Sequence, residues 1–136
     1  MREKAHILIV DDDESVRRVL TLMLRNKAGY ETDVASTGQQ ALDKVREQFF
    51  DAVVLDVRLP DMTGVELLAP FKALHPDMVT VVVTGHPSLE TAVEALNQGA
   101  AAYITKPLDM DNVLMTVDGA LEKQRLLAEN RRLYQA

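Results

Sequence analysis

Five short runs that favour β-structure alternate with segments of helical periodicity, and this alternation restricts the fold more than any other feature. The expected strands are residues 6–10, 31–35, 52–55, 78–83 and 101–104. Most of these runs are continuously apolar and rich in Val, Ile and Leu, as strands covered on both faces are. Strands that alternate with helices are joined by right-handed crossovers into a parallel sheet. The chain is therefore predicted to be an α/β protein, a doubly wound five-stranded parallel sheet with helices on both faces.

Helices are expected at residues 14–27, 37–48, 63–74 and 88–98, and from residue 109 to the end of the chain. Two of them begin with the pattern of a capping box, in which a hydroxyl residue precedes Glu or Gln by three positions: Thr37 with Gln40, and Thr63 with Glu66. Pro70 lies inside the third helix, where it removes one backbone hydrogen bond and is expected to kink or shorten the helix. Asp109 is expected to cap the last helix.

Composition narrows the functional classes. The 136 residues suit one domain, and the formal net charge of −6 makes the chain a poor partner for nucleic acid, because phosphate contacts dominate that affinity. The absence of cysteine excludes disulfides and thiolate metal sites, and fits a reducing cytoplasm. The apolar run near the start is followed by three aspartates, so it is no signal peptide, and no run is long enough to span a membrane. We therefore expect a cytoplasmic protein without direct contacts to nucleic acid or membrane.

Polar side chains follow the apolar residues of four expected strands. They are Asp11, Asp12, Asp56, Thr84 and Lys106, each at the end of its run or within two residues of it. The carboxyl ends of parallel strands meet at one edge of a sheet, where open α/β sheets bind their ligands. The sequence therefore predicts that three carboxylates, a hydroxyl and an ammonium share one rim.

This set of groups suits phosphoryl chemistry with a metal ion. Clustered carboxylates repel unless a cation neutralises them, and oxygen-only ligands suit a hard cation such as Mg²⁺. An aspartate beside such a cation can act as the nucleophile toward phosphorus, while the cation, a lysine and a hydroxyl stabilise the phosphoryl oxygens. Each residue also has an ordinary explanation. Asp11, Asp12 and Asp56 can be helix caps or strand ends, Thr84 a turn hydroxyl and Lys106 a surface lysine. Asp13 is expected only to cap a helix or lie on the surface.

Four motifs carry a resemblance to a known family: ILIVDDDES, VVLDVRLPDMTG, VVVTGH and AYITKPLD. Each is weak alone, but together, in order and at strand ends, they resemble the receiver domain of two-component response regulators. The resemblance covers nearly the whole chain and implies the flavodoxin-like receiver fold, with sheet order 2-1-3-4-5. It also implies that Asp56 is the phosphoacceptor. Asp12, Asp56 and the backbone carbonyl of Arg58 would be direct Mg²⁺ ligands, and Asp11 would hold a metal-bound water.

The resemblance also implies a switch. Thr84 matches the hydroxyl that moves onto the phosphoryl group, and Lys106 matches the lysine that pairs with that group. Tyr103 matches the aromatic residue whose rotamer follows the switch, although plain packing explains it as well. The Lys106–Pro107 peptide bond is expected to be cis. His86 and the side chain of Arg58 are interpreted as rim residues.

The last helix is expected to run past the domain. The receiver should occupy residues 4–122, which leaves residues 123–136 as a helical extension. Leu126 and Leu133 are seven residues apart with Asn130 between them, which is a coiled-coil spacing. A solvated helix end explains the same residues. The extension resembles those that connect receivers to transcriptional output domains, and no output domain lies in this chain.

The functional prediction is a switch driven by phosphorylation. A histidine kinase would phosphorylate Asp56 with Mg²⁺ bound, and Thr84 and Tyr103 would then control pairing or an output domain. Pairing would use the face of the fourth helix, fifth strand and fifth helix, or the C-terminal helix. The chain is not expected to be an enzyme. Three rival hypotheses stay open. The first is an aspartate-nucleophile phosphohydrolase, although such enzymes usually have an acid at the position of Arg58. The second is a flavodoxin-like cofactor binder, although the sequence has no Gly-rich phosphate cradle, and the third is a receiver that works without phosphorylation.

Overall fold

The computed structural model describes the backbone of residues 4–135 and the side chains of residues 4–133. The strands are β1 (His6–Val10), β2 (Glu31–Ala35), β3 (Ala52–Asp56), β4 (Val79–Thr84) and β5 (Ala102–Thr105). The helices are α1 (Glu14–Ala28), α2 (Gly38–Glu47), α3 (Val65–Leu74), α4 (Leu89–Asn97) and α5 (Met110–Gln135). Strands and helices alternate along the chain as the sequence predicted.

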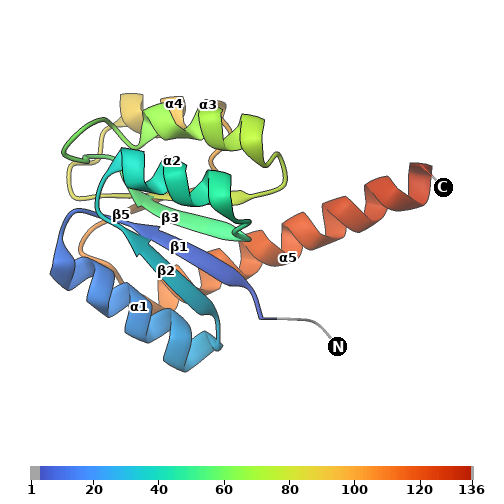
Figure 1. Cartoon of the computed structure of the whole chain (residues 1–136), viewed down its shortest axis with the longest axis horizontal. Coiled ribbons are helices and arrows are strands. Elements are labelled where there is room, and N and C mark those ends of the chain that lie inside the picture. Colours follow the sequence, from blue (N-terminus) through green and yellow to red (C-terminus); the bar gives the residue numbers. More distant parts are fainter. Residues whose placement is uncertain (1–3, 136) are drawn as a thin grey trace.

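The five strands form one parallel sheet of order β2-β1-β3-β4-β5, which confirms the predicted topology. Helices α1 and α5 cover one face of the sheet, and α2, α3 and α4 cover the other (Figure 1). The carboxyl ends of all five strands therefore lie at one edge. β1 and β3 occupy the centre, so residues at their ends lie in the middle of that edge.

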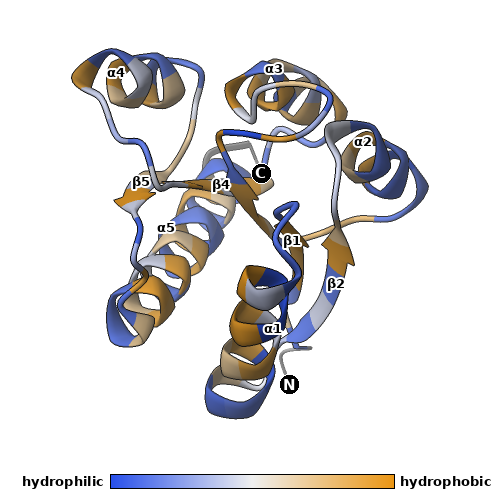
Figure 2. Ribbon diagram, turned by 90° about the vertical axis from the view of Figure 1, so that its left-hand side faces the viewer, coloured by the Kyte–Doolittle hydropathy of each residue, from blue (hydrophilic) through white to orange (hydrophobic). Residues whose placement is uncertain are grey.

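A hydrophobic core lies on each face of the sheet, because successive strand residues point to opposite sides. In β1, Leu8 and Val10 join the core under α2 and α3, while Ile7 and Ile9 join the core under α1 and α5. Figure 2 shows the apolar sheet between helices whose outer faces are polar. Two fully buried cores make the central strands rigid supports for the residues that follow them.

The helix starts agree only partly with the predicted caps. Asp13 caps α1 by accepting from the N–H groups of Ser15 and Val16, as expected for this residue. Thr37 caps α2 through the N–H of Gln40, but the Gln40 side chain accepts from the N–H of Ser36 rather than that of Thr37. The capping box of α2 is therefore only half formed as predicted, because the return hydrogen bond to Gln40 comes from the residue before the cap.

The expected capping box of α3 was wrong in its position. The hydroxyl of Thr63 accepts from the N–H of Glu66 at 3.3 Å, yet the cap residue is Gly64 and α3 begins at Val65. Gly64 lies where the loop comes too close to the main chain of Asp56 for a Cβ atom to fit. The expected effect of Pro70 was also wrong in one respect, since α3 runs through it to the predicted end near residue 74.

Strands β4 and β5 each lie one residue later than the sequence indicated. Their ends are set by pairing, and Thr84 pairs in register with Thr105, so both polar residues belong to the sheet. Local hydropathy placed the strand ends at the last apolar residues, Val83 and Ile104. This shift moves Thr84 into the last position of β4 without changing the edge on which it lies.

Helix α5 is continuous from the domain into the extension, as predicted. Val113, Val117 and Leu121 pack in the core, and Asp109 accepts from two N–H groups of the first turn. The second half passes the end of the sheet and leads away from it (Figure 1). Arg131 pairs with Asp77 of the α3–β4 loop at 2.6 Å.

Candidate functional site

The polar residues predicted at the strand ends meet at the carboxyl edge of the sheet. Lys106, one residue beyond β5, donates from Nζ to Asp11 Oδ2 at 2.9 Å and to Asp56 Oδ2 at 3.2 Å. Asp11 follows β1 directly, and Asp56 is the last residue of β3. The two aspartate side chains are 1% and 10% exposed, and that of Lys106 is 22% exposed. One ammonium group therefore pairs with two buried carboxylates that follow different strands, and it balances only one of their two charges.

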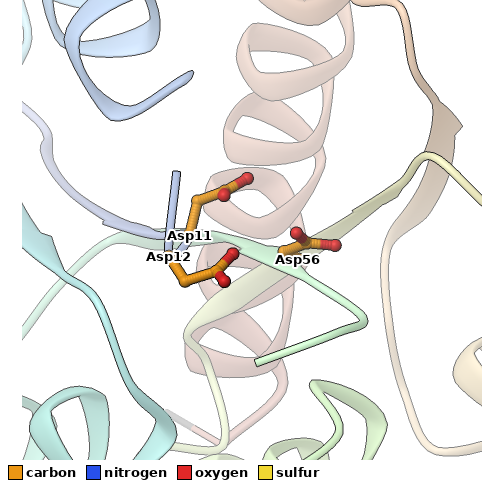
Figure 3. A group of neighbouring side chains, drawn as sticks. All are labelled: Asp11, Asp12 and Asp56. Atoms are coloured by element: carbon orange, nitrogen blue, oxygen red, sulfur yellow. The ribbon is translucent and has the colours of Figure 1, made fainter. Parts of the chain in front are cut away.

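Asp12 completes an acidic cluster with Asp11 and Asp56. One carboxylate oxygen from each residue lies within 4.8 Å of the others, and Figure 3 shows the three side chains gathered at the strand ends. Asp12 is exposed, whereas the other two residues are buried. An oxygen-only set of this kind suits a hard divalent cation. The cluster could therefore hold a metal ion.

The electrostatics of the site favour a cation. Burial raises the pKa of Asp56, the negative charge of Asp11 raises it further, and the hydrogen bonds from Arg58 and Lys106 offset this only in part. Burial disfavours the charged form of Lys106, but the hydrogen bonds and charges of Asp11 and Asp56 outweigh it and raise the lysine pKa. The site thus holds an aspartate that is costly to ionise and an ammonium that keeps its proton. Additional positive charge near Asp56 would stabilise its ionised form.

Arg58 lies in the loop between β3 and α3, next to Asp56. Its main-chain N–H points to Asp56 Oδ1 at 3.3 Å, and its side chain is exposed, as expected for a rim residue. The loop is closed by an antiparallel bridge between Arg58 and Thr63 and by a hydrogen bond from Gly64 N to Val57 O at 2.6 Å. The main chain of Arg58 is therefore held beside the carboxylate of Asp56.

Gly64 is required where this loop returns to the strand. A Cβ atom at this position would lie 2.2 Å from the main-chain oxygen of Asp56 and 2.9 Å from Cδ1 of Leu55. No side chain fits so close to backbone, so the loop can close against β3 only at a glycine. This glycine, and not the predicted Thr63, is the cap residue of α3.

Thr84 and Tyr103 lie beyond the acidic cluster, toward α4. Thr84 is 1% exposed, and its Oγ1 accepts from the N–H of His86 at 3.0 Å. Tyr103 is half-buried, and its hydroxyl accepts from the N–H of Ser88, the cap residue of α4, at 3.4 Å. His86 is exposed, as expected for a rim residue. A chain of neighbouring groups therefore runs from the site to the start of α4.

The end of β5 has the predicted cis peptide bond between Lys106 and Pro107. The N–H of Lys106 donates to the carbonyl of Thr84 at 2.7 Å. This hydrogen bond joins the ends of β4 and β5 at Thr84 and Lys106, the two residues that supply the hydroxyl and the ammonium of the site.

Two residues near the site received no role from sequence reasoning. Arg17 of α1 donates from Nη1 to the main-chain carbonyl of Asp11 at 2.7 Å. Asp61, in the loop that carries Arg58, accepts from the first N–H groups of α2. Neither contact has a local sequence signal, because each joins residues that the fold brings together. The one local indication is Gly38, directly after the Thr37 cap, because a glycine at the start of a helix can mark a place where another segment packs closely.

Replacing Thr84 by Val is expected to lower the free energy of unfolding by about 1 kcal/mol, because the buried hydroxyl and its hydrogen bond to the N–H of His86 are lost. Urea denaturation measures the loss. Thr105→Val is the matched control, since Thr105 is exposed and pairs with Thr84 across the strands. Equal losses for both variants would show that the hydroxyl of Thr84 contributes nothing specific.

The fold and the site define a class of protein. The family model of the response regulator receiver domain matches residues 7–118. The chain belongs to this family, and the resemblance carried by its motifs is confirmed. Receiver domains are the phosphoacceptor signalling domains of response regulators and are in general not enzymes. Membership of this family favours neither the phosphohydrolase nor the flavodoxin-like cofactor binder.

Curated relatives of the chain include regulatory proteins. The chain is 48% identical to the transcriptional regulatory protein ZraR of Escherichia coli (strain K12) over 115 residues, which are 85% of this chain and 26% of that protein. It is 38% identical to the regulatory protein AtoC of the same organism over 130 residues, 96% of this chain and 28% of that protein. The chain thus spans about a quarter of the length of these curated relatives.

Solved receiver structures share the fold. A CheY-like receiver domain protein from Methanospirillum hungatei JF-1 has a TM-score of 0.87 and 39% identity, with 90% of this chain and 98% of that chain covered. The beryllofluoride-activated NtrC4 receiver domain dimer has a TM-score of 0.83 and 39% identity, with 88% and 98% covered. In residues 4–135, no helix is both long and apolar enough to cross a membrane.

Proposed function

We propose that this receiver domain is switched by phosphorylation of Asp56 with Mg²⁺ bound. The observation that carries the proposal is the placement of Asp56 among an ammonium and two further carboxylates at the end of a buried central strand. A nucleophile there is held rigidly, while the exposed Asp12 leaves one side of the cluster open to solvent. Asp56 and Asp11 both lie between Lys106 and the candidate cation site, and of the two Asp56 is the less deeply buried.

The donor set fits Mg²⁺. Asp12, Asp56 and the backbone carbonyl of Arg58 would be its direct ligands, and Asp11 would hold a metal-bound water. These donors are all oxygen atoms, as Mg²⁺ requires, and the raised pKa of Asp56 means that more positive charge would stabilise the cluster. When bound, the cation supplies charge neutralisation for the phosphoryl oxygens.

Three residues of the chain would then have separate roles in the phosphoryl transfer. A carboxylate oxygen of Asp56 forms the bond to phosphorus while the bond from phosphorus to the donor's histidine nitrogen breaks, and the imidazole leaves. Lys106, already 3.2 Å from Asp56, can pair with a phosphoryl oxygen. Thr84 accepts one hydrogen bond at present, so its own proton can be donated to a phosphoryl oxygen.

The signal would leave the site through Thr84 and Tyr103. Movement of the Thr84 hydroxyl toward a phosphoryl group removes the acceptor of His86 N–H, and Tyr103 contacts the cap of α4. The face formed by α4, β5 and α5 would then change its affinity for a second copy or for an output domain. The donor would be a sensor histidine kinase, and the chain would act in the cytoplasm as response regulators do. The chain itself would turn over no external substrate and bind no DNA directly.

Incubation with acetyl phosphate, with Mg²⁺ or with EDTA, tests the proposal by intact mass. We expect one added phosphoryl group that requires Mg²⁺ and that peptide mapping places on Asp56. Transfer from a phosphorylated histidine kinase is the second donor. A chain that accepts phosphate from neither donor would refute the proposal and favour a receiver that works without phosphorylation, while rapid release of phosphate from many small esters would favour the hydrolase.

A further inference from the structure

The loop that carries Arg58 has a defined shape of its own. Leu59 N donates to Met62 O at 3.1 Å, and the bridge between Arg58 and Thr63 joins the two arms. The hydrogen bond from Gly64 N to Val57 O closes the base of the loop. These contacts hold the arms together, but they do not fix the tip of the loop to another element.

Asp61 at the tip makes that connection. Its Oδ1 accepts from Gly38 N at 2.8 Å and its Oδ2 accepts from Gln39 N at 3.0 Å. These are the first two N–H groups of α2, which no residue of the helix can satisfy. The two N–H groups lower the pKa of Asp61, and its charge has the sign that favours a helix N-terminus. The carboxylate thus bridges two elements that are more than twenty residues apart in the sequence.

Met62 provides a second contact between the same elements. A Cβ atom at Gly38 would lie 2.5 Å from both Cγ and Sδ of Met62. Met62 also packs against the core on this face of the sheet. The tip of the loop is therefore held against Gly38, the first residue of α2, by the polar side chain of Asp61 and the apolar side chain of Met62.

We infer that Asp61 is a positioning residue for the phosphorylation site, because it fixes the loop whose main chain at Arg58 faces the acidic cluster. Only Leu59 and Pro60 separate Asp61 from Arg58, and the proline ring removes one backbone freedom from that short link. Asp61 is outside the acidic cluster, so its effect passes through the loop. The inference rests on the proposed function, in which the carbonyl of Arg58 is a Mg²⁺ ligand.

The competing explanation is that Asp61 only caps α2, and the chain offers a matched control. Thr37 satisfies the third N–H of the same turn, that of Gln40, at 3.1 Å, but it belongs to α2 and not to the loop. Thr37→Ala removes a cap of this helix and leaves the contact between Asp61 and α2 in place. Asp61→Ala removes a cap of the helix and also the contact that holds the loop against it.

The first measurement needs no metal. Amide hydrogen exchange by NMR is expected to become faster at Gly38 and Gln39 in Asp61→Ala, and the resonances of Val57 and Arg58, which are not neighbours of the substituted residue in the sequence, should shift or broaden. In Thr37→Ala, exchange should become faster at Gln40 while Val57 and Arg58 keep their resonances. Unchanged resonances of Val57 and Arg58 in Asp61→Ala would overturn the inference.

The second measurement is the Mg²⁺ affinity, followed by the amide shifts of residues near the cluster. Loss of a partner that orients metal ligands typically weakens binding by 10–100-fold. Because Asp61 acts on Arg58 only through the two residues between them, we expect a rise in Kd of about 5-fold for Asp61→Ala. Asp61→Asn keeps one acceptor oxygen and should lie between Asp61→Ala and the wild type. Thr37→Ala should bind as the wild type does.

The results separate the two proposals. If the wild type binds Mg²⁺ and Asp61→Ala binds it equally well, or if Thr37→Ala weakens binding as much as Asp61→Ala does, the inference is wrong. If the wild type binds no Mg²⁺, the proposed function fails instead. In that case the metal-free exchange and resonance data alone decide whether Asp61 fixes the loop.

Discussion

Asp56→Asn is expected to abolish phosphoryl uptake without unfolding the chain. The amide is not a nucleophile toward phosphorus, so the adduct should fall below detection in the mass spectrum. Stability should be equal to that of the wild type or higher. Burial and the charge of Asp11 raise the pKa of Asp56, so its ionised form costs folding free energy above that pKa, and the neutral amide removes this cost.

The loss of one ion pair does not reverse this expectation, because Lys106 keeps its 2.9 Å contact with Asp11. We expect Tm at pH 7 to rise by up to about 4 °C, and the difference should shrink as the pH falls and Asp56 takes up a proton. Asp13→Asn is the matched control, since Asp13 only caps α1 and Asn caps equally well. An undiminished adduct in Asp56→Asn would show that another residue is the acceptor.

Lys106→Met is expected to have the largest effect on stability within the site. The change leaves two carboxylates, Asp11 and Asp56, close together, mostly buried and without their cation. Removing one partner of a buried ion pair costs about 3–5 kcal/mol. Because Lys106 is itself partly exposed, we expect a loss of roughly 2–3 kcal/mol at pH 7 without Mg²⁺, measured by urea denaturation.

Two conditions should reduce that loss. Saturating Mg²⁺ supplies the missing positive charge, so the variant should gain more stability from the ion than the wild type does. Lowering the pH from 7 to 5 should also narrow the gap, because Asp56 has a raised pKa and takes up a proton as the pH falls. Lys44→Met is the control, since Lys44 is a partly exposed lysine that pairs with only one carboxylate, that of Asp33, and its loss should cost about 1 kcal/mol or less. A gap that neither Mg²⁺ nor pH changes would indicate lost packing instead.

The sequence was sufficient to predict what depends on short-range rules. The apolar runs identified the strands, and the parallel topology then brought Asp56 and Lys106 to one edge, although they are 50 residues apart. The cap at Asp13 and the long α5 followed from local composition in the same way. The motif resemblance added the sheet order and the cis bond before Pro107, which periodicity alone does not determine.

The remaining features depend on contacts that the fold creates. Thr84 belongs to β4 because it pairs with Thr105 of β5, and residue 64 must be glycine because the main chain of Asp56 leaves no room for a Cβ atom. The cap from Asp61 to Gly38 spans 23 residues. Such effects cannot be read from neighbours in the sequence, since the partner is known only once the elements are packed.

The unbroken course of α5 gives the chain a lever. From Leu121, the last residue in the core, the helix continues to Gln135 without a hinge, a length of about 21 Å at the usual rise of about 1.5 Å per residue. A tilt of about 10° at the sheet would therefore move the far end by about 3–4 Å, a movement that opens the exposed ion pair between Arg131 and Asp77. A shift near Tyr103 that is too small to change the core would reach the end of α5 as a displacement of atomic size.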